Sequence, residues 1–108
     1  MRVATIQMHD LVAGTLSETE DGYIFRYHPQ YLSAPEAQPV SLSLPLQREE
    51  FHDKRLFPFF DGLIPEGWLL DIAEKTWKIN SRDRMGLLMA CCRDCIGAVS
   101  VFAEEDSP

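Results

Sequence analysis

Three cysteines near the C-terminus are the residues whose type and spacing could most readily do chemistry. Cys92-Arg93-Asp94-Cys95 has the CxxC spacing of a redox pair, and Cys91 is adjacent. A thiolate is activated at a helix N-terminus, whereas these thiols follow a predicted helix, where the dipole raises a thiol pKa. A zinc site would need a fourth ligand, and His9, His28 and His52 are all distant in sequence. We therefore interpret the cysteines as small buried hydrophobic residues and expect no metal and no cofactor.

The remaining polar residues do not assemble a recognisable active site. The histidines have no motif spacing and no obvious nucleophile beside them. Asp53, Asp61, Glu66 and Asp71 supply carboxylates, but acids at such positions commonly cap helices or face solvent. The six glycines are isolated from one another, so there is no phosphate-binding loop. We expect no catalytic residues, and hence a protein that is not an enzyme.

Length and charge further restrict the classes of protein to which the chain could belong. With 108 residues, 45% of them hydrophobic, the chain can bury one core, and we expect one domain over residues 1–103 followed by an acidic tail, 104–108. The net charge of −7 makes direct DNA binding unexpected, because phosphate neutralisation needs a basic face. No apolar run approaches the ~18 residues of a membrane span, and the N-terminus does not resemble a signal peptide. We therefore expect no membrane contact and a cytoplasmic location.

The elements that must position any site are predicted by hydrophobic periodicity. Alternation over 3–8 and 11–16, and again over 23–27 after the turn signal Asp21-Gly22, predicts a three-strand meander. Leucine at every second position of 41–46 predicts a strand with three leucines on one face, and Pro45 makes it an edge strand or a strand end. Polar residues 47–55 predict a loop. The apolar run 96–102 predicts an interior strand that closes the sheet.

Helical patterns fill the second half. Residues 56–62 predict a short helix with Pro58 in its first turn, and Pro65 suits the start of a second helix. The core stripe of this second helix would comprise Leu69, Ile72, Ala73, Thr76 and Trp77. Ser81 is a candidate N-cap for a third, whose buried face would carry Met85, Leu88, Met89 and Cys92. The predicted fold class is α+β: a small, mostly antiparallel sheet packed with about three helices.

Trp68 is the one residue whose placement does not fit a simple core role. If Leu69 is central to the apolar stripe, Trp68 lies about 100° around the helix axis, at the border between core and solvent. Its neighbours three and seven residues on are Asp71 and Lys75, both charged. It could lie flat over the rim of the core, or it could anchor a partner, since exposed aromatic residues dominate binding hot spots.

Three ordered motifs carry a family resemblance. They are SLSLPL at 41–46, FFDGLIPE at 59–66 and RDCIGAV at 93–99. Together they resemble the N-terminal subdomain of HipA-type serine/threonine kinases, toxins of bacterial toxin–antitoxin systems that phosphorylate aminoacyl-tRNA synthetases. The resemblance runs from the opening strands to the closing strand. In the family the last motif usually has serine where this chain has Cys95, in keeping with a structural role for that cysteine.

The resemblance implies a partner rather than a reaction. The phosphate-binding loop, catalytic aspartate and metal-binding residues that follow this subdomain in HipA kinases are not in the sequence. The chain thus resembles the small antitoxin of three-component HipBST systems, which would bind a HipT-like kinase in a complex with a HipB-like helix-turn-helix protein. We expect the contact segment to be Ile64, Pro65, Glu66, Gly67 and Trp68, with Trp68 as anchor.

Two alternatives stay open. The chain could be a regulatory N-terminal fragment of a HipA-type kinase toxin. It could also be a small thiol-dependent or metal-binding protein that uses Cys91, Cys92 and Cys95.

Overall fold

The fold is α+β, as the periodicity predicts. The computed structural model describes residues 2–64, 75, 83–91 and 98–103. Within these ranges it contains five strands and three helices. In chain order they are β1 (Val3–Met8), β2 (Leu11–Thr19), β3 (Gly22–Tyr27), α1 (Pro29–Leu32), β4 (Phe51–Asp53), α2 (Pro58–Asp61), α4 (Arg84–Cys91) and β5 (Val99–Ala103).

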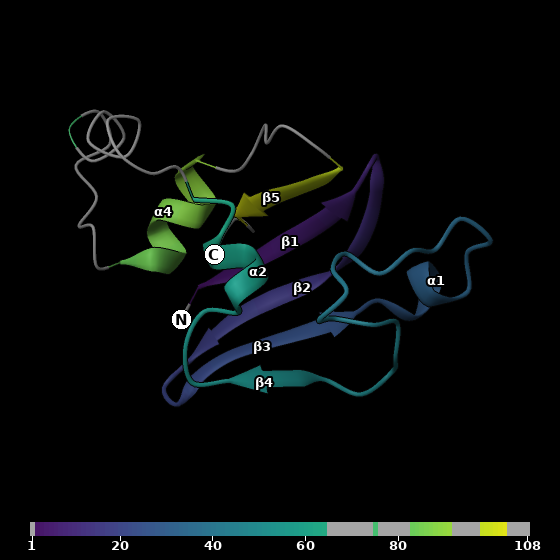
Figure 1. Ribbon diagram of the computed structural model, residues 1–108, viewed down its shortest axis with the longest axis horizontal. Coiled ribbons are helices and arrows are strands. Elements are labelled where there is room, and N and C mark those ends of the chain that lie inside the picture. Colours follow the sequence, from purple (N-terminus) through teal and green to yellow (C-terminus); the bar gives the residue numbers. More distant parts are fainter. Residues whose placement is uncertain (1, 65–74, 76–82, 92–97, 104–108) are drawn as a thin grey trace, which may run out of the picture.

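One antiparallel sheet, with the strand order β4-β3-β2-β1-β5, organises the described residues (Figure 1). The predicted meander β1-β2-β3 is confirmed. The β2–β3 turn requires glycine, because Gly22 has a φ of 147° and a Cβ there would lie 2.2 Å from the Asp53 carbonyl oxygen. The alternation seen in the sequence places Ile6, Leu16 and Phe25 on the same, buried face.

The closing strand exists, but its predicted interior position is wrong. β5 pairs with β1 and forms an edge of the described sheet. Its apolar run is divided between the two faces: Val99 and Val101 are buried, whereas Ser100 and Phe102 on the other face are half-buried. A continuous apolar run therefore did not require burial on both faces.

The predicted edge strand over 41–46 is also wrong, as is the loop expected over the whole of 47–55. Ser41 and Leu44 close a tight turn through an isolated bridge, so the three leucines do not share a face. Leu44 is buried, while Leu42 is fully exposed and Leu46 is partly exposed. Within the expected loop, Phe51 begins strand β4 and stacks on Phe25 at a centroid distance of 6.2 Å.

The helix over 56–62 is confirmed as α2, with Pro58 in its first position. The next helix, expected from Pro65 with its stripe Leu69, Ile72, Ala73, Thr76 and Trp77, lies outside the described residues. α4 is confirmed with Met85 and Leu88 fully buried and Met89 half-buried, while Cys92 lies outside the described residues. Leu87, which was not on the predicted buried face, is also fully buried.

The helices α2 and α4 lie on one face of the sheet, as Figure 1 shows. Their buried side chains and those of the inward face of the sheet form one hydrophobic core. α1 lies in the segment expected to be a connector and packs against β2. No helix in the described part of the chain is long and apolar enough to cross a membrane. The tail 104–108 lies outside the described residues.

Candidate partner-binding site

The predicted contact segment begins in the core and continues outside the described residues. Ile64 has only 3% of its surface exposed and belongs to the core cluster. Pro65, Glu66, Gly67 and Trp68 lie outside the described residues. The structure therefore defines the base from which this segment leaves, and the role of the segment stays a prediction.

That base is fixed by the aromatic residues of α2. Phe60 is fully buried and contacts Phe25 of the sheet at a ring-centroid distance of 5.4 Å. Phe57, which precedes the helix, packs edge-on against Phe60 at 6.2 Å. The backbone N–H of Ile64 donates to the Asp61 carbonyl at 3.2 Å, which extends the turn past the end of the helix. Ile64 is thereby held against the sheet.

An ion pair joins the two ends of the segment 65–82. The Arg84 Nε at the start of α4 donates to Asp61 Oδ1 at the end of α2, over 2.6 Å. α2 and α4 also pack directly against each other. The chain therefore leaves one helix and re-enters the next at adjacent points. Asp61 thus serves as a structural ion-pair partner.

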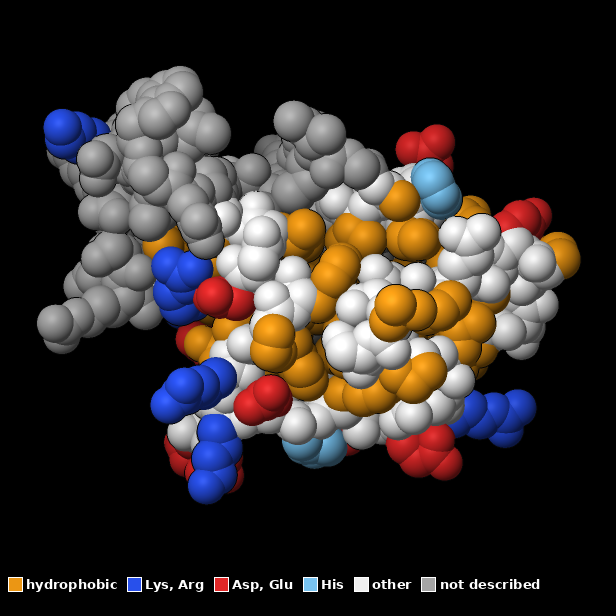
Figure 2. All heavy atoms as spheres, viewed as in Figure 1, with side chains coloured by type: hydrophobic (Ala, Val, Ile, Leu, Met, Phe, Trp, Pro, Cys, Tyr) orange, Lys and Arg blue, Asp and Glu red, His pale blue; other side chains and the backbone are white. Residues whose placement is uncertain are grey.

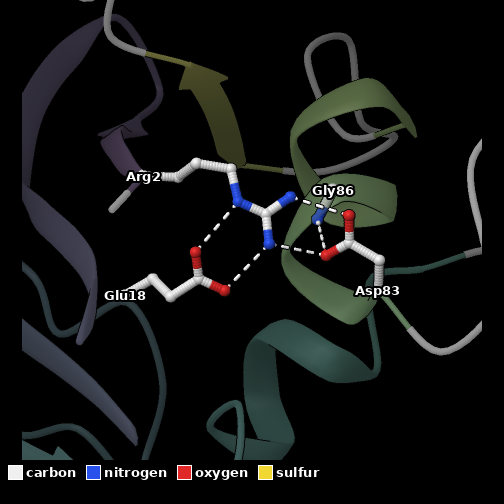
Figure 3. A network of polar contacts seen from close by, with 4 residues as sticks. All are labelled: Arg2, Glu18, Asp83 and Gly86. Atoms are coloured by element: carbon white, nitrogen blue, oxygen red, sulfur yellow. Dashed lines mark hydrogen bonds and ion pairs between the residues drawn. The ribbon is translucent and has the colours of Figure 1, made fainter. Parts of the chain in front are cut away.

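A four-residue network, which we call the Arg2 clamp, attaches α4 to the sheet (Figure 3). The Arg2 guanidinium donates to both carboxylate oxygens of Glu18 on β2, at 3.0 and 2.8 Å. It also donates to both oxygens of Asp83, at 2.8 and 2.6 Å. Such bidentate pairs fix orientation as well as adding energy. Residues distant in sequence are therefore locked in a single geometry where the segment 65–82 rejoins the fold.

The electrostatics of the clamp favour its charged form. Hydrogen bonding from Arg2 lowers the pKa of Glu18 and the pKa of Asp83 below their ordinary values. The same bonds raise the pKa of Arg2 above its ordinary value. These are the shifts of a structural ion-pair network and do not indicate a proton-transfer group poised near neutrality.

The clamp also caps α4. Asp83 Oδ1 accepts a hydrogen bond from the Gly86 backbone N–H at 3.1 Å, the geometry of an N-cap side chain bonding three residues on. The helix begins at Arg84, so Asp83 occupies the capping position predicted for Ser81. A Cβ on Gly86 would lie 2.4 Å from Asp83 Oδ2 and 3.0 Å from Arg2 Nη1. A side chain at position 86 would therefore displace the Asp83 carboxylate from its present position in the clamp.

Other residues with chemical potential are dispersed. His9 lies in the β1–β2 turn with a φ of 56°, His28 bonds Thr15 at 2.7 Å, and His52 lies exposed on β4. Asp53 accepts a hydrogen bond from the Arg55 backbone N–H at 3.1 Å. The described ranges contain no group of three or more His, Cys, Asp or Glu side chains arranged to hold a metal. Cys92, Cys95, Glu66 and Asp71 lie outside those ranges.

The Arg2 clamp could not be predicted from local sequence patterns, for a physical reason. Arg2 and Glu18 are 16 positions apart, and Arg2 and Asp83 are 81 apart, so no local spacing rule connects them. One signal was available: an aspartate directly before the apolar periodicity of 84–91 is a typical N-cap. That signal identifies Asp83 but not its partner.

Comparison with known proteins assigns this fold to a class of domain. The HipA N-terminal domain family matches residues 4–102, which is nearly the whole chain. The chain belongs to the HipA N-terminal domain family. A solved structure described as the N-terminal domain of HipA toxin superimposes with a TM-score of 0.77 at 30% identity, covering 99% of this chain and 96% of that one. The match is to this domain and not to a catalytic kinase domain.

Two curated relatives differ greatly in length. A Haemophilus influenzae protein with no assigned function is 31% identical over 105 residues, covering 97% of this chain and 95% of that protein. A Sinorhizobium fredii protein named "Putative kinase Y4mE" is 27% identical over 109 residues, covering all of this chain but only 26% of its own length. The same domain therefore occurs in a chain of similar size and as about a quarter of a longer protein.

Proposed function

We propose that this chain is an antitoxin of the HipS type, which binds and neutralises a HipT-like serine/threonine kinase. It would act without catalysis of its own, by occupying a surface of the kinase. A HipB-like helix-turn-helix protein would supply DNA contact in a ternary complex, since a net charge of −7 suits this chain poorly for phosphate binding.

The observation that carries the proposal is the extent of the family match. Residues 4–102 correspond to the HipA N-terminal domain, and all of this chain corresponds to 26% of the Sinorhizobium kinase-named protein. A domain that occurs within a longer chain named as a putative kinase is suited to dock on a kinase as a separate chain. As a separate chain, the domain would bind the kinase through the same surface that it presents to the rest of that longer protein.

The inhibitory route we favour is steric and conformational. The domain would dock where a HipA kinase carries its own N-terminal subdomain. Residues 65–68, which follow the buried Ile64, would obstruct the nucleotide site or hold the kinase open. Trp68 would be the anchor. The Asp61–Arg84 ion pair and the Arg2 clamp support this route, because they fix both ends of the segment that contains Trp68.

Growth rescue during kinase expression tests the proposal. Wild-type chain should restore growth, and Trp68→Ala should lose that protection while its thermal melt stays unchanged. Truncation of a central aromatic anchor costs at least ~2 kcal/mol, roughly thirtyfold in affinity. Trp77→Ala is the matched control: the predicted stripe places Trp77 in the core, so we expect it to lower the melting temperature. Full protection by Trp68→Ala would refute the site, and absence of rescue by wild type would refute the function.

The second candidate function is a regulatory N-terminal domain of a HipA-type kinase toxin. The 26% coverage of the Sinorhizobium protein favours it, because there the domain is part of a longer chain. The downstream coding sequence discriminates: a separate start codon and an intact kinase gene support the antitoxin, and uninterrupted coding supports the regulatory domain.

A further inference from the structure

Leu42 is the most exposed large hydrophobic side chain in the described part of the protein. Its surface is 99% exposed, against 42% for Leu11 and 37% for Leu46. It stands at the tip of a loop whose flanking residues Val40 and Leu44 are both buried. A single exposed leucine is ordinary on a protein surface, so its significance depends on how the loop is held.

Two buried tyrosines hold this loop. The Tyr27 hydroxyl accepts a hydrogen bond from the Val40 backbone N–H at 3.0 Å and donates a short one to the Leu44 carbonyl. The Tyr31 hydroxyl donates to the Gln38 carbonyl at 2.7 Å and accepts from the Gln38 N–H at 3.0 Å. Their rings stack at a centroid distance of 6.1 Å with an interplanar angle of 6°. The main chain of 38–44 is thus fastened at four points.

The tip itself is closed by local hydrogen bonds. The Leu44 N–H donates to the Ser41 carbonyl at 3.0 Å, and the Ser43 N–H donates to the Ser41 hydroxyl oxygen at 3.3 Å. Leu42 is therefore presented on a preorganised turn between two uncharged serines. Ordering a loop on binding costs free energy, and a loop that is already ordered avoids that cost.

Two residues beyond this loop, the chain enters the lining of a groove with a volume of about 830 Å³. Leu46, Leu32 and Pro29 supply apolar lining, and Arg26 and Glu50 are among its charged residues. Figure 2 shows hydrophobic side chains gathered over the region where α1 and the loop after it lie in Figure 1. Leu42 is four residues before Leu46 in the chain, and we call the exposed leucine together with this groove the Leu42 surface.

We propose that the Leu42 surface is a second docking site for the kinase, and that Leu42 inserts into an uncharged apolar pocket of it. The inference rests on the proposed function and adds a contact independent of residues 64–68. The kinase is the occupant that fits best. In the Sinorhizobium protein, which is named as a putative kinase, this domain is joined to a further three-quarters or so of the chain. A second copy of this chain fits poorly, since each copy carries a net charge of −7.

The test is a binding titration with the kinase encoded immediately downstream, as a separate gene or as the continuation of the reading frame. Leu42→Asp should weaken binding about thirtyfold or more, the loss typical of a hot-spot anchor, while Leu42→Met should bind as wild type does. Leu11→Asp is the matched control, because it makes the same substitution at another exposed leucine, and it should bind normally. The two Leu42 variants should melt as wild type does, because Leu42 is 99% exposed, and Leu11→Asp, at a position 42% exposed on β2, is titrated at a temperature well below its own melt.

The outcomes separate this inference from the proposed function. If wild type does not bind the kinase, the proposed function fails and the Leu42 inference fails with it. If wild type binds and Leu42→Asp binds equally well, only the inference is overturned. Equal weakening by Leu11→Asp, or a wild-type dimer that Leu42→Asp dissociates, would also overturn it.

Discussion

Removing the Arg2 guanidinium should measurably destabilise the fold. Arg2 makes four charge-assisted hydrogen bonds to Glu18 and Asp83, with side-chain exposures of 38%, 26% and 36%. Ion pairs this exposed are screened by solvent, and each contributes at most ~1 kcal/mol. Two such pairs give at most about 2 kcal/mol for Arg2→Ala, and a decrease in melting temperature of at most about 10 °C for a domain of this size. Equilibrium urea unfolding measures the free energy directly.

The pH dependence of this difference is the sharper test. Because Arg2 lowers the pKa of Glu18 and the pKa of Asp83 in the folded state, the unfolded chain takes up protons first as the pH falls. The clamp's contribution is therefore complete above the ordinary carboxyl pKa, near ~4, and is lost as the pH falls through the lowered folded-state values. The stability gap between wild type and Arg2→Ala should be constant from neutral pH to about pH 5 and narrow below it.

Two variants control the experiment. Arg2→Lys keeps the charge but cannot bridge two carboxylates bidentately, so it should recover only part of the lost stability. Arg48→Ala removes an exposed loop arginine that has no ion pair among the described residues and should leave the unfolding free energy unchanged. A gap between wild type and Arg2→Ala that is absent, or that stays constant from pH 7 to pH 3, would refute the reasoning.

Two further substitutions probe the base of the candidate segment. Gly86→Ala should lower the unfolding free energy by about 1 kcal/mol, because overpacking against Asp83 costs ~1–3 kcal/mol and the helix propensity of alanine returns up to ~1 kcal/mol. Gly62→Ala is the comparison: its added Cβ would lie 3.2 Å from the Pro58 carbonyl oxygen, a tight contact but a longer one than at Gly86, so urea unfolding should show a smaller loss, and equal losses would argue against a clash specific to Gly86. Ile64→Ala should cost about 2–5 kcal/mol by leaving a cavity in the core. An unchanged thermal melt for Ile64→Ala would show that Ile64 acts as a surface contact and not as a core residue.

The parts of the fold that sequence reasoning predicted are those governed by local rules. Side-chain alternation and the Asp21-Gly22 turn were sufficient for β1 to β3. Proline at the first turn was sufficient for α2. Each of these features depends on residues within a few positions of one another, so periodicity carries the information.

The predictions from sequence are wrong where tertiary contacts override the local pattern of residues. Leucine at alternate positions of 41–46 predicted a strand, but the buried Tyr27 hydroxyl hydrogen-bonds the main chain at Val40 and Leu44 and holds a turn instead. Phe51 was assigned to a polar loop because its neighbours are polar, yet it stacks on Phe25 and begins β4. The Arg2 clamp joins three separate parts of the chain, a pairing that one sequence alone does not reveal.

The composition of the described surface constrains how the proposed interface could reach high affinity. Only Leu11, Val12, Leu42 and Leu46 are large hydrophobic residues exposed in the described ranges, so those ranges offer little extended apolar area. An interface of this kind depends on a few anchors surrounded by a polar rim, as hot-spot energetics require. The net charge of −7 would contribute mainly to the rate of encounter with a basic partner surface, whereas the anchors would determine the dissociation rate. For the proposed function, the total area buried in the interface would therefore matter less than how the anchors are held. Leu42 is presented on a rigid turn, and the segment that contains Trp68 has fixed ends.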